Sequence, residues 1–588
     1  MAIPQKNIIT EQTLPTRFDA AVFRLKTAIL QTKRSFHDVL DSNIKKASID
    51  KQLIHQPVIA ESISELWTET EPEERFLIAG KIQNLRIAVR SLNGLEIAAG
   101  DVFSFWKQVG RAIRRRGFVK GRELREGCII PNVGGGLCQI SNALYDAALK
   151  ANFEIVERHA HSQVIAGSLA ETGRDATVFW NYIDLRFRAD HAFRIEASLS
   201  SDKLTVRFRG SKTENSVEQK ARRRILHADQ PRSCATCGMD DCHSVVIDPH
   251  AADFGKTAFL VDDVWPEFNA YIERTHQPKD VLLIPLDGNR YRKPNYAWAT
   301  NGFSRVEQSV VATLLRSYSS RRLASQGSAR QLNLLATYEK LADSYARRLD
   351  HECLHVVVQQ NILPYLWQKG HLGGRTFDVL MTATPMAQLQ ENLDRAASLN
   401  PESKTLGDFR ADPELVNAET EALTNARKII TPHTAIAGLF GERSVLLNWS
   451  LPTISADKTF LTSPSSSPRI VFVASTVGRK GCYEFREAVR GLAVTIVTAG
   501  PLIEGNDFWH GFKSKPAGND PLTGADLVVL PAYVEHKPRR LLRAAALGIP
   551  VIASNECGIG NVDGVTLVNS GDVTQLRSAI MERLNNLV

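Results

Sequence analysis

The chain has 588 residues, more than a single hydrophobic core usually organises, so we expect about three or four domains. Its hydrophobic content of 43% and charged content of 23% are ordinary for a soluble globular protein, and no run of about 18 apolar residues is present to cross a membrane. The net charge of +8 is small for this length, and no nucleic-acid-binding motif accompanies it, so we expect no nucleic-acid partner.

The compartment is inferred from the first residues and from the cysteines. The N-terminal stretch lacks the basic region and apolar core of a secretory signal, so the sequence predicts a cytoplasmic protein. The eight cysteines are few for this length, and a disulfide framework is not expected in a reducing compartment. The densest basic run covers residues 111–122. We interpret it as a solvated basic face, with peripheral contact to the anionic inner-membrane surface or to phosphorylated substrates as the alternative.

The first elements along the chain are predicted to be helices. Apolar residues at helical spacing indicate one or two amphipathic helices over residues 17–50. A helix over residues 74–92 should end at the Asn93-Gly94 turn, before a short strand. A strand at residues 128–130 then precedes a glycine turn and a helix that begins with Cys138.

Antiparallel strands are expected to follow that helix. Residues 153–165 and 175–187 are rich in β-branched and aromatic side chains, as strands are. Two alternating runs over residues 193–208 flank a Ser-Ser-Asp turn, which predicts a hairpin. The charged residues 212–224 indicate a linker or an exposed helix.

From residue 254 the pattern changes to short apolar strands that alternate with helical segments, which is typical of a parallel sheet covered by helices. A Ser/Pro-rich break at residues 463–468 separates two such series. We therefore expect two doubly wound domains, with a ligand cleft at the carboxyl ends of their strands. The predicted strands are 258–261, 281–284, 354–358, 379–382, 428–430 and 445–447 in the first series, and 470–473, 494–498, 527–530, 551–553 and 565–567 in the second.

The glycine turn is a candidate reactive site. Three glycines at residues 134–136 lead directly into the helix whose first turn carries Cys138. A helix N-terminus presents unbonded N–H groups and a partial positive charge, which favour a thiolate over a thiol. Glycines also let other groups approach the sulfur closely. The alternative is a tight turn that precedes a small buried cysteine.

Potential partners of the thiol follow in the sequence. His159 and His161 come first, then Asp175 and Asp184. Alternation along a strand would put both histidines on the same face. The order Cys, His, Asp is that of papain-like and transglutaminase-like thiol enzymes, so Cys138 with His161 and Asp175 is the catalytic hypothesis. Structural hydrogen bonds for both histidines are the alternative.

One family resemblance covers about residues 74–208. Its segments occur in the order KIQNLRIAVRSLNG, GDVFSFWKQVG, RRRGFVKGRELREG, GGGLCQISNALYDAAL, ERHAHS and DATVFWNYIDLRF. Together they resemble the VanW family, named from vancomycin-resistance clusters. The resemblance implies a role at the bacterial cell envelope and does not define a biochemical activity. A thiol role for Cys138 is therefore inferred from the residues alone.

A cysteine cluster between these regions is a candidate metal site. A Cys-x2-Cys pair places two thiolates on one knuckle turn, the commonest half-site of structural zinc. We predict such a zinc in the segment 212–253, with an iron–sulfur cluster or reduced, unliganded cysteines as the alternatives. The pair is Cys234 and Cys237, and the residues that would complete a tetrahedron are Cys242 with His243, His227 or His250.

A second resemblance covers about residues 254–588. The segments IVFVASTVGRKGCYEF (470–485) and ADLVVLPAYVEHKPRRLLRAAALGIPVIASNECGIG (525–560) resemble the nucleotide-sugar-binding half of retaining GT-B glycosyltransferases. KIITPHTAIAGLFGERSVLLNW (428–449) resembles the end of the acceptor half. By this resemblance Lys480 binds the donor phosphate, and Glu535 is the first acid of a Glu-x7-Glu motif near the donor.

The chain departs from that family pattern in two places. Arg543 stands where the second glutamate is expected, and Ser475 stands where many relatives have a loop arginine, for which Arg479 is a substitute. A sugar diphosphate leaving group requires cations and backbone donors, but Arg543 would reverse a charge at the donor site. An altered site, or one that only binds or scaffolds, is therefore the alternative to an active transferase.

The sequence thus predicts a multidomain α+β and α/β protein. We expect transfer of a sugar from a nucleotide-sugar donor to a cell-envelope polysaccharide, surface-polysaccharide or lipid-linked acceptor. The alternatives are a cysteine-dependent amidase or transpeptidase at Cys138, and a non-catalytic protein that binds envelope precursors. The expected regions are N-terminal helices (1–73), a VanW-like helix-plus-antiparallel-sheet domain (74–211), a Cys-rich linker (212–253) and two Rossmann-like GT-B domains (254–462 and 463–588).

Overall fold

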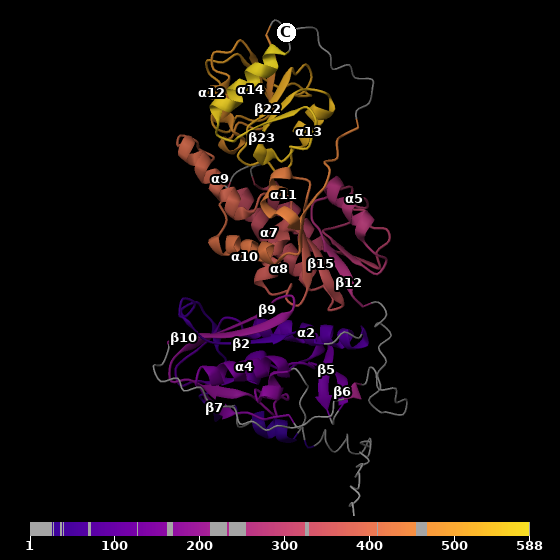
Figure 1. The fold of residues 1–588 in the computed structure, drawn as a ribbon, viewed down its shortest axis with the longest axis vertical. Coiled ribbons are helices and arrows are strands. Elements are labelled where there is room, and N and C mark those ends of the chain that lie inside the picture. The colour runs from indigo at the N-terminus through magenta and orange to yellow at the C-terminus, as the bar shows by residue number, and fades with distance from the viewer. Residues whose placement is uncertain are drawn as a thin grey trace, which may run out of the picture. The chain divides into compact units, whose positions relative to one another are not determined.

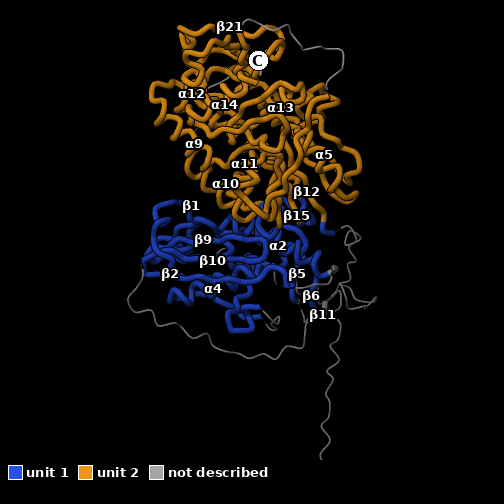
Figure 2. Tube along the Cα trace, turned by 45° about the horizontal axis from the view of Figure 1, so that its top comes forward, with its two compact units in different colours: residues 1–255, 350–354, 372–375 blue, residues 256–349, 355–371, 376–588 orange. Residues whose placement is uncertain are grey.

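The computed structural model divides the chain into two compact units (Figures 1 and 2). The first unit comprises residues 1–255, 350–354 and 372–375, and the second comprises residues 256–349, 355–371 and 376–588. Among the described residues, no helix is both long enough and apolar enough to cross a bilayer. The structure describes residues 26, 29–35, 38, 40–68, 72–125, 128–161, 168–211, 232–233, 254–323, 328–408, 410–453 and 467–586.

The main sheet of the first unit has five antiparallel strands over its described residues, in the order β1-β3-β9-β10-β2. The predicted hairpin is confirmed as β9 and β10, and alternate residues of β10, such as Leu204, Val206 and Phe208, are buried because successive side chains point to opposite faces. The strands are β1 (Ser48–Ile49), β2 (Val58–Glu65), β3 (Leu95–Ile97), β9 (Phe193–Leu199) and β10 (Lys203–Gly210).

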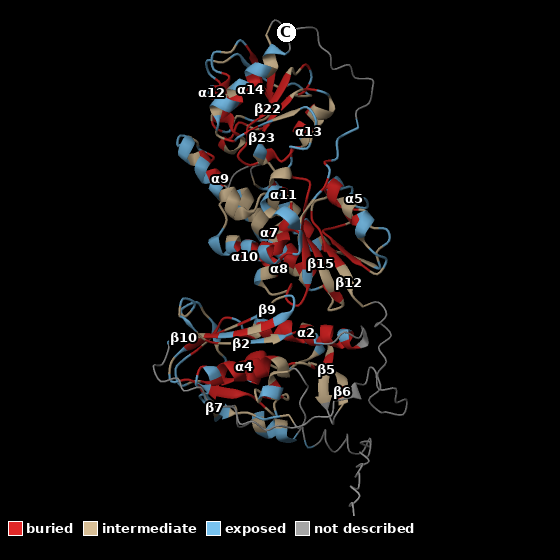
Figure 3. Cartoon of the chain, viewed as in Figure 1, coloured by how far each residue is buried: buried red, intermediate tan, exposed pale blue. Residues whose placement is uncertain are grey.

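Helices and two small sheets complete the described part of this unit. The predicted helices before Asn93-Gly94 and after the glycine turn are confirmed as α2 and α4, and α4 is buried along most of its length (Figure 3). The helices are α2 (Pro72–Leu92), α3 (Phe105–Val109) and α4 (Cys138–Lys150). The small sheets have the orders β11-β6-β5 and β4-β8-β7, from β4 (Val102–Ser104), β5 (Lys120–Arg125), β6 (Cys128–Val133), β7 (Glu154–Glu157), β8 (Arg186–Arg188) and β11 (Arg232–Ser233).

Two predictions for this unit are wrong in part. The N-terminal helical prediction extended too far, because residues 48–49 form β1 and pair with β3. The long strands expected over 153–165 and 175–187 are reduced, in the described part, to β7, β8 and isolated bridges. Asn181 adopts a left-handed φ of 48°, which turns the chain there. The apolar side chains of this segment, such as Leu185, fill the core without a continuous ladder.

The second unit contains two parallel sheets. Over the described residues 254–453, seven strands have the order β14-β13-β12-β15-β16-β17-β18, so the order reverses beside β12. The strands are β12 (Lys256–Leu260), β13 (Val281–Ile284), β14 (Arg305–Gln308), β15 (Cys353–Gln359), β16 (Thr376–Leu380), β17 (Lys428–Thr431) and β18 (Ser444–Leu446). The helices are α5 (Pro266–Thr275), α6 (Val310–Arg321), α7 (Ser328–Ala346), α8 (Leu363–Gln368), α9 (Met386–Leu399), α10 (Pro413–Asn425) and α11 (Thr434–Phe440).

The second parallel sheet lies within residues 467–586, where six strands have the order β21-β20-β19-β22-β23-β24. Both sheets therefore have the doubly wound topology that the alternating pattern predicted. The strands are β19 (Arg469–Phe472), β20 (Thr495–Thr498), β21 (Ser514–Pro516), β22 (Leu527–Leu530), β23 (Val551–Ser554) and β24 (Val565–Val568), and the helices are α12 (Cys482–Ala488), α13 (Arg539–Ala546) and α14 (Val573–Asn585).

Two strands of these sheets were missed. β14 and β21 lie at sheet edges. β14 has the polar sequence RVEQ and is only half-buried, and β21 is an exposed SKP segment. Neither carries the apolar run by which buried strands are recognised.

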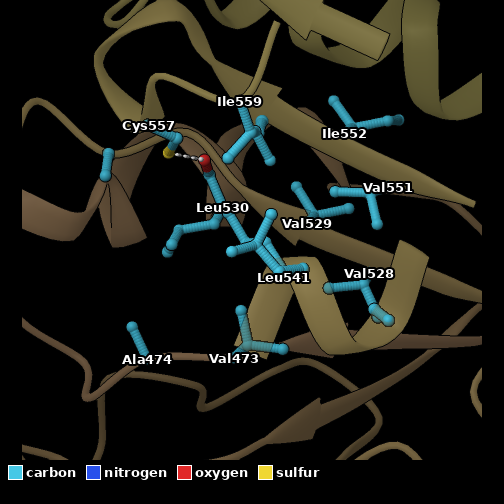
Figure 4. Close-up of a cluster of buried hydrophobic side chains, with 14 of the residues drawn as sticks. Val473, Ala474, Val528, Val529, Leu530, Leu541, Val551, Ile552, Cys557 and Ile559 are labelled. Carbon is cyan, nitrogen blue, oxygen red and sulfur yellow. Dashed lines mark hydrogen bonds between the residues drawn. The ribbon is translucent and has the colours of Figure 1, made fainter. Parts of the chain in front are cut away.

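A continuous core holds β19, β22 and β23 in place. Every residue of β22 and β23 is buried, as expected for strands that are covered on both faces. Figure 4 shows Leu541 of α13 beside Leu530 of β22, and the thiol of Cys557 donates to the backbone oxygen of Leu530 at 3.5 Å. Burial raises the pKa of Cys557 to about 12, so this thiol is a structural group.

Candidate functional site

A cavity of about 400 Å³ lies at the carboxyl ends of β19 and β22, where the strand order of the second sheet reverses. In doubly wound sheets this reversal opens a crevice between the two neighbouring loops, and ligands bind there. The lining comes from the loop after β19, from the loop after β22 and from the first turn of α13. The position agrees with the ligand cleft expected from the sequence.

The turn of Gly478–Lys480 positions two of the predicted donor residues. Lys480 Nζ donates to Glu535 Oε2 at 2.9 Å and to the backbone oxygen of Val534 at 2.7 Å. The backbone oxygen of Arg479 in turn accepts from the N–H of Tyr533 at 3.0 Å. These bonds join the loop after β19 to the loop after β22, so Lys480 and Glu535 meet at the cavity.

Gly481 is required for this close approach. It has a φ of 73°, and a Cβ at this position would lie 2.1 Å from the backbone oxygen of Pro531. A larger residue would therefore separate the two loops. The Lys-Gly sequence at 480–481 combines a cation with the residue type that the backbone needs there.

The charges of the two loops favour an ionised carboxylate beside cations. Burial alone would raise the pKa of Glu535, but the charge and hydrogen bond of Lys480 lower it below its ordinary value. Burial lowers the pKa of Arg479, and the nearby carboxylate of Glu535 opposes that shift. Glu535 is therefore a hydrogen-bond acceptor at neutral pH.

The first turn of α13 adds three cations that the sequence prediction had not assigned. Arg540 Nη1 donates to the backbone oxygen of Val473 at 2.7 Å, which fixes α13 against the end of β19. Arg539 forms two 2.7 Å bonds with Glu267, and Lys537 lies 3.2 Å from Asp263. The HKPRR sequence was the available signal, because a basic run at the start of a helix favours an anion site.

The cavity as a whole is basic. Among the described residues that line it, the cations are Arg479, Lys480, Lys537, Arg539 and Arg540, and the carboxylate is Glu535. Ser475 also lines it, as the resemblance implied. Cationic side chains beside a helix N-terminus can hold a diphosphate.

Arg543, the departure from the family motif, does not line this cavity. Its guanidinium forms two hydrogen bonds with Asp520, at 2.9 and 2.5 Å. The positive charge that replaces the second glutamate is thus neutralised by a carboxylate of the same domain.

Two histidines lie at the loop after β22, of which His433 is buried and His536 is half-buried. Burial lowers the pKa of His433 to about 4, so its imidazole is neutral, and Nε2 donates to the backbone oxygen of Glu556 at 3.1 Å and of Glu535 at 3.4 Å. Burial also lowers the pKa of His536 to about 3. His536 Nε2 has no hydrogen-bond partner among the described residues.

The first unit brings together the other predicted residues. Cys138 is the first residue of α4, and its Sγ lies 3.7 Å from Thr177 Oγ1. His161 Nδ1 lies 2.5 Å from Asp175 Oδ1, and the backbone N–H of His161 donates to Asp175 Oδ2 at 2.6 Å. The β-bridge between His159 and Thr177 holds these two segments side by side, so His161 and Asp175 lie next to the Thr177 that Cys138 contacts.

The remaining histidine and aspartate of this segment have other partners. The His159 side chain is half exposed and lies 3.4 Å from Glu157. Asp184 is buried and accepts from Ser104 Oγ at 2.6 Å and from the N–H of Trp106 at 3.1 Å. The sequence left both histidines open as the base for Cys138. The structure leaves His161 as the candidate.

The pair Cys138 and His161 is electrostatically coupled. Burial would raise the pKa of Cys138, but the hydrogen bond and charge of His161 lower it below the ordinary thiol value. Burial would lower the pKa of His161, but hydrogen bonds to Asp175 and Cys138 raise it to about 10. This arrangement favours a thiolate beside an imidazolium.

The three glycines before Cys138 are explained by packing. A Cβ on Gly135 would lie 2.3 Å from the backbone oxygen of Gly121, and one on Gly136 would lie 2.1 Å from Lys81 Cγ. A Cβ on Gly134 would lie 2.6 Å from the Cβ of Ala112. The glycines thus let the loop pack closely against β5 and α2, which fixes the start of α4.

The proposed zinc ligands Cys234, Cys237, Cys242 and His243 lie outside the described residues. Within the described ranges, no group of three or more His, Cys, Asp or Glu side chains is arranged to hold a metal ion. The structural zinc stays a prediction.

Comparison with known families identifies two domains. Residues 80–209 match the family described as VanW like protein, and residues 467–586 match the family described as Glycosyl transferases group 1. The chain therefore contains a VanW domain and a group 1 glycosyltransferase domain, which confirms the first resemblance and, over residues 467–586, the glycosyltransferase part of the second. The two parallel sheets fit the Rossmann-like domains of a GT-B fold.

Curated relatives match about a fifth of the chain. The vancomycin B-type resistance protein VanW of Enterococcus faecalis is 33% identical over 132 residues, which are 21% of this chain and 47% of that protein. The uncharacterized protein YoaR of Bacillus subtilis is 31% identical over 105 residues, which are 18% of this chain and 34% of that protein. The chain thus spans about half of the first relative and about a third of the second.

Solved structures match a little more than half of the chain. Sucrose-phosphate synthase from Thermosynechococcus elongatus has a TM-score of 0.37 and 15% identity, and the match covers 56% of this chain and 90% of that one. HepE from Anabaena in complex with UDP has a TM-score of 0.32 and 15% identity, with 56% and 90% covered.

Proposed function

We propose that this protein transfers a sugar from a nucleotide-sugar donor to a cell-envelope or surface-polysaccharide acceptor, which includes lipid-linked acceptors. The observation that carries the proposal is the basic cavity at the reversal between β19 and β22, within the group 1 glycosyltransferase domain. Its volume of about 400 Å³ lies in the range of small-molecule sites, roughly 300–1,000 Å³.

The donor diphosphate is expected to bind against the loop after β19 and the first turn of α13. Lys480, Arg479 and Arg540 supply positive charge, and the backbone N–H groups of that turn supply further donors. When the bond between the sugar and the diphosphate breaks, negative charge develops on the leaving oxygen. Cations held in place before the reaction stabilise that charge.

Glu535 is proposed as the residue that orients the donor. Its ionised carboxylate accepts from Lys480 and from the N–H of Lys537 at 2.9 Å, so it is fixed at the cavity wall. An ionised acceptor there binds hydroxyl groups of the donor ribose or sugar. We assign the enzyme to the retaining type, as the motif resemblance implies, so the new bond forms on the face from which the diphosphate leaves.

The acceptor is inferred from the fused VanW domain and from the name of its vancomycin-resistance relative. We place the protein in the cytoplasm, with peripheral contact to the inner-membrane surface through the basic run at 111–122. Arg114, Arg115 and Arg116 of this run are exposed, as contact with anionic lipid requires.

Donor binding tests the transferase proposal directly. Calorimetric titration with UDP, GDP, ADP and CDP should find at least one diphosphate that binds the full chain. Lys480→Ala should weaken that binding roughly 10- to 100-fold, because a charge-assisted bond contributes about 1.5–3 kcal/mol. Arg543→Ala is the matched control, since its guanidinium pairs with Asp520 outside the cavity.

Two results would contradict the proposal. Either none of the four diphosphates binds, or Lys480→Ala binds as tightly as the wild-type protein. Hydrolysis of the matching nucleotide sugar then separates a transferase from a protein that only binds, and Glu535→Gln should lower that rate in the transferase.

We also propose a structural zinc held by Cys234, Cys237, Cys242 and His243, as the Cys-x2-Cys spacing implies. Metal analysis of the purified chain should find about one zinc per chain, and Cys234→Ser with Cys237→Ser should remove it. Retention of the metal in the double variant would contradict this assignment.

A further inference from the structure

The Cys138 region of the first unit contains a set of reactive side chains that the proposed transferase reaction does not use. It contains the Cys138 thiol at the start of α4, next to Thr177, and on the segments bridged at Thr177 the His161 imidazole with the Asp175 carboxylate bonded to its Nδ1. These are the nucleophile, the base and the orienting group of a thiol enzyme.

The orienting group is itself rigidly held. Asp175 is buried and uses one oxygen for His161 Nδ1 and the other for the backbone N–H of His161. Its backbone oxygen accepts from Arg158 Nε at 2.6 Å. This double attachment fixes both the position and the ring orientation of His161.

Helix α4 also holds the segment that carries Asp175. The N–H of Ala176 donates to Asn142 Oδ1 at 2.7 Å, and Ser141 Oγ donates to the backbone oxygen of Ala176 at 2.5 Å. Asn142 and Ser141 lie in the same helix as Cys138. The nucleophile and the orienting carboxylate are therefore positioned by one element, so their separation does not depend on a flexible connection.

The residue Cys138 is less buried than the other described cysteines whose pKa is perturbed. Cys138 is partly exposed, and the His161 side chain is 18% exposed. Cys482 and Cys557 are buried, and burial raises the pKa of each. Only a partly exposed, electrostatically favoured thiolate combines nucleophilicity with access.

We propose that Cys138, His161 and Asp175 form a second catalytic site, which transfers acyl groups from amide or ester substrates through a thioester on Cys138. The Cys138 thiolate attacks the carbonyl carbon. As the carbon–nitrogen or carbon–oxygen bond breaks, the His161 imidazolium gives its Nε2 proton to the leaving amine or alkoxide. Water or a second amine then attacks the thioester carbon and gives a proton to His161, and the carbon–sulfur bond breaks, which releases the acyl product and restores the Cys138 thiolate.

Asp175 acts in both steps without losing its charge. It accepts from Nδ1 and thereby leaves Nε2 as the nitrogen that exchanges a proton with the substrate. Among the described residues, Arg158 lies beside Asp175 and donates to its backbone oxygen at 2.6 Å. His161 and Asp175 therefore have distinct roles, which substitutions can separate.

Thiol reactivity of the full chain provides the first test. Iodoacetamide labelling, followed by peptide mapping, should modify Cys138 at pH 6 about 100-fold faster than an unperturbed thiol, which is largely protonated there. His161→Ala should lose that advantage, and labelling should then rise only as the pH approaches the ordinary thiol range. His159→Ala and Cys128→Ser are the matched controls and should label Cys138 at the wild-type rate.

Acyl transfer provides the second test. With p-nitrophenyl acetate, the wild-type chain should release about one equivalent of p-nitrophenolate in a burst and should carry one acetyl group on Cys138 by mass spectrometry. Cys138→Ala should show neither, and Asp175→Asn should acylate more slowly with unchanged unfolding temperature. No nucleotide sugar is present in either test, so their outcome is separate from that of the transferase proposal.

The proposal is overturned if Cys138 labels no faster than an unperturbed thiol at pH 6, or if His161→Ala labels like the wild type. Absence of the acetyl group from Cys138 in the wild-type chain would also overturn it. If Asp175→Asn does not fold, the wild-type and His161→Ala profiles still decide the result.

Discussion

The two parallel sheets of the second unit have the same strand order around the point where that order reverses. They differ in the side chains that lie at this point. In the second sheet, the reversal between β19 and β22 opens into a cavity lined by cations. In the first, the carboxyl end of β12 leads into Asp262, which is 1% exposed and forms two bonds to Arg316 Nη1, at 2.7 and 2.8 Å. Asn361 donates to the same carboxylate at 2.6 Å.

The difference shows that topology provides a place for a ligand and that side chains decide whether the place is basic. The carboxylate at the reversal of the first sheet repels a diphosphate, and its ion pair neutralises the charge of the neighbouring arginine. At the reversal of the second sheet, the cations exceed the carboxylate, and a helix N-terminus adds to them. The same fold thus yields one anion site from two equivalent crevices.

The largest predicted effect concerns the ion pair at the first reversal. Arg316→Ala should destabilise the chain by about 3–5 kcal/mol, because it leaves the Asp262 carboxylate buried without its cation. Urea unfolding measures the loss, and diphosphate binding at the second sheet should persist under native conditions. Arg321→Ala, an exposed arginine of the same helix, is the control and should change stability by less than about 0.5 kcal/mol. Equal stability of the two variants would show that the pair is not needed.

The second prediction concerns His433, which connects α11 to the loop that carries Glu535. Its folded pKa of about 4 lies below the ordinary value of 6.5. Between these values the unfolded chain binds a proton that the folded chain does not, so stability should fall by about 3 kcal/mol as the pH falls through this window. His433→Gln should lose about 3 kcal/mol less stability than the wild type in urea unfolding between about pH 8 and pH 4, while the part due to His536 remains. His510→Gln, an exposed histidine, should keep the wild-type dependence.

The third and smallest effect concerns the glycine that joins the two loops at the basic cavity. Gly481→Ala should lower the free energy of unfolding by about 2 kcal/mol and weaken diphosphate binding, because the new residue would have a positive φ and a Cβ close to Pro531. Gly491 has a similar φ of 76° and nothing within 4 Å, so Gly491→Ala should cost only about 1 kcal/mol and leave binding intact. If both variants lost the same amount of diphosphate affinity, the close contact of the two loops at Gly481 would not be needed for donor binding, and this prediction would be wrong.

Part of the candidate site was predictable because its signals are local. Lys480 and Glu535 belong to recognisable segments, and the structure places them 2.9 Å apart. The order of Cys138, His161 and Asp175 also predicted their association. Lys537, Arg539 and Arg540 were missed, because a basic run at the start of a helix has several ordinary explanations until its position relative to β19 is known.

The sequence by itself determined the buried strands of the two parallel sheets, the helix that begins at Cys138 and both family resemblances, because each depends on neighbouring residues and their spacing. Only the tertiary structure decided that His161 pairs with Asp175 while His159 lies beside Glu157. It also decided that Arg543 pairs with Asp520 away from the cavity and that one reversal is basic while the other is filled. These outcomes depend on which distant loops pack together, and spacing along the chain carries no information about that.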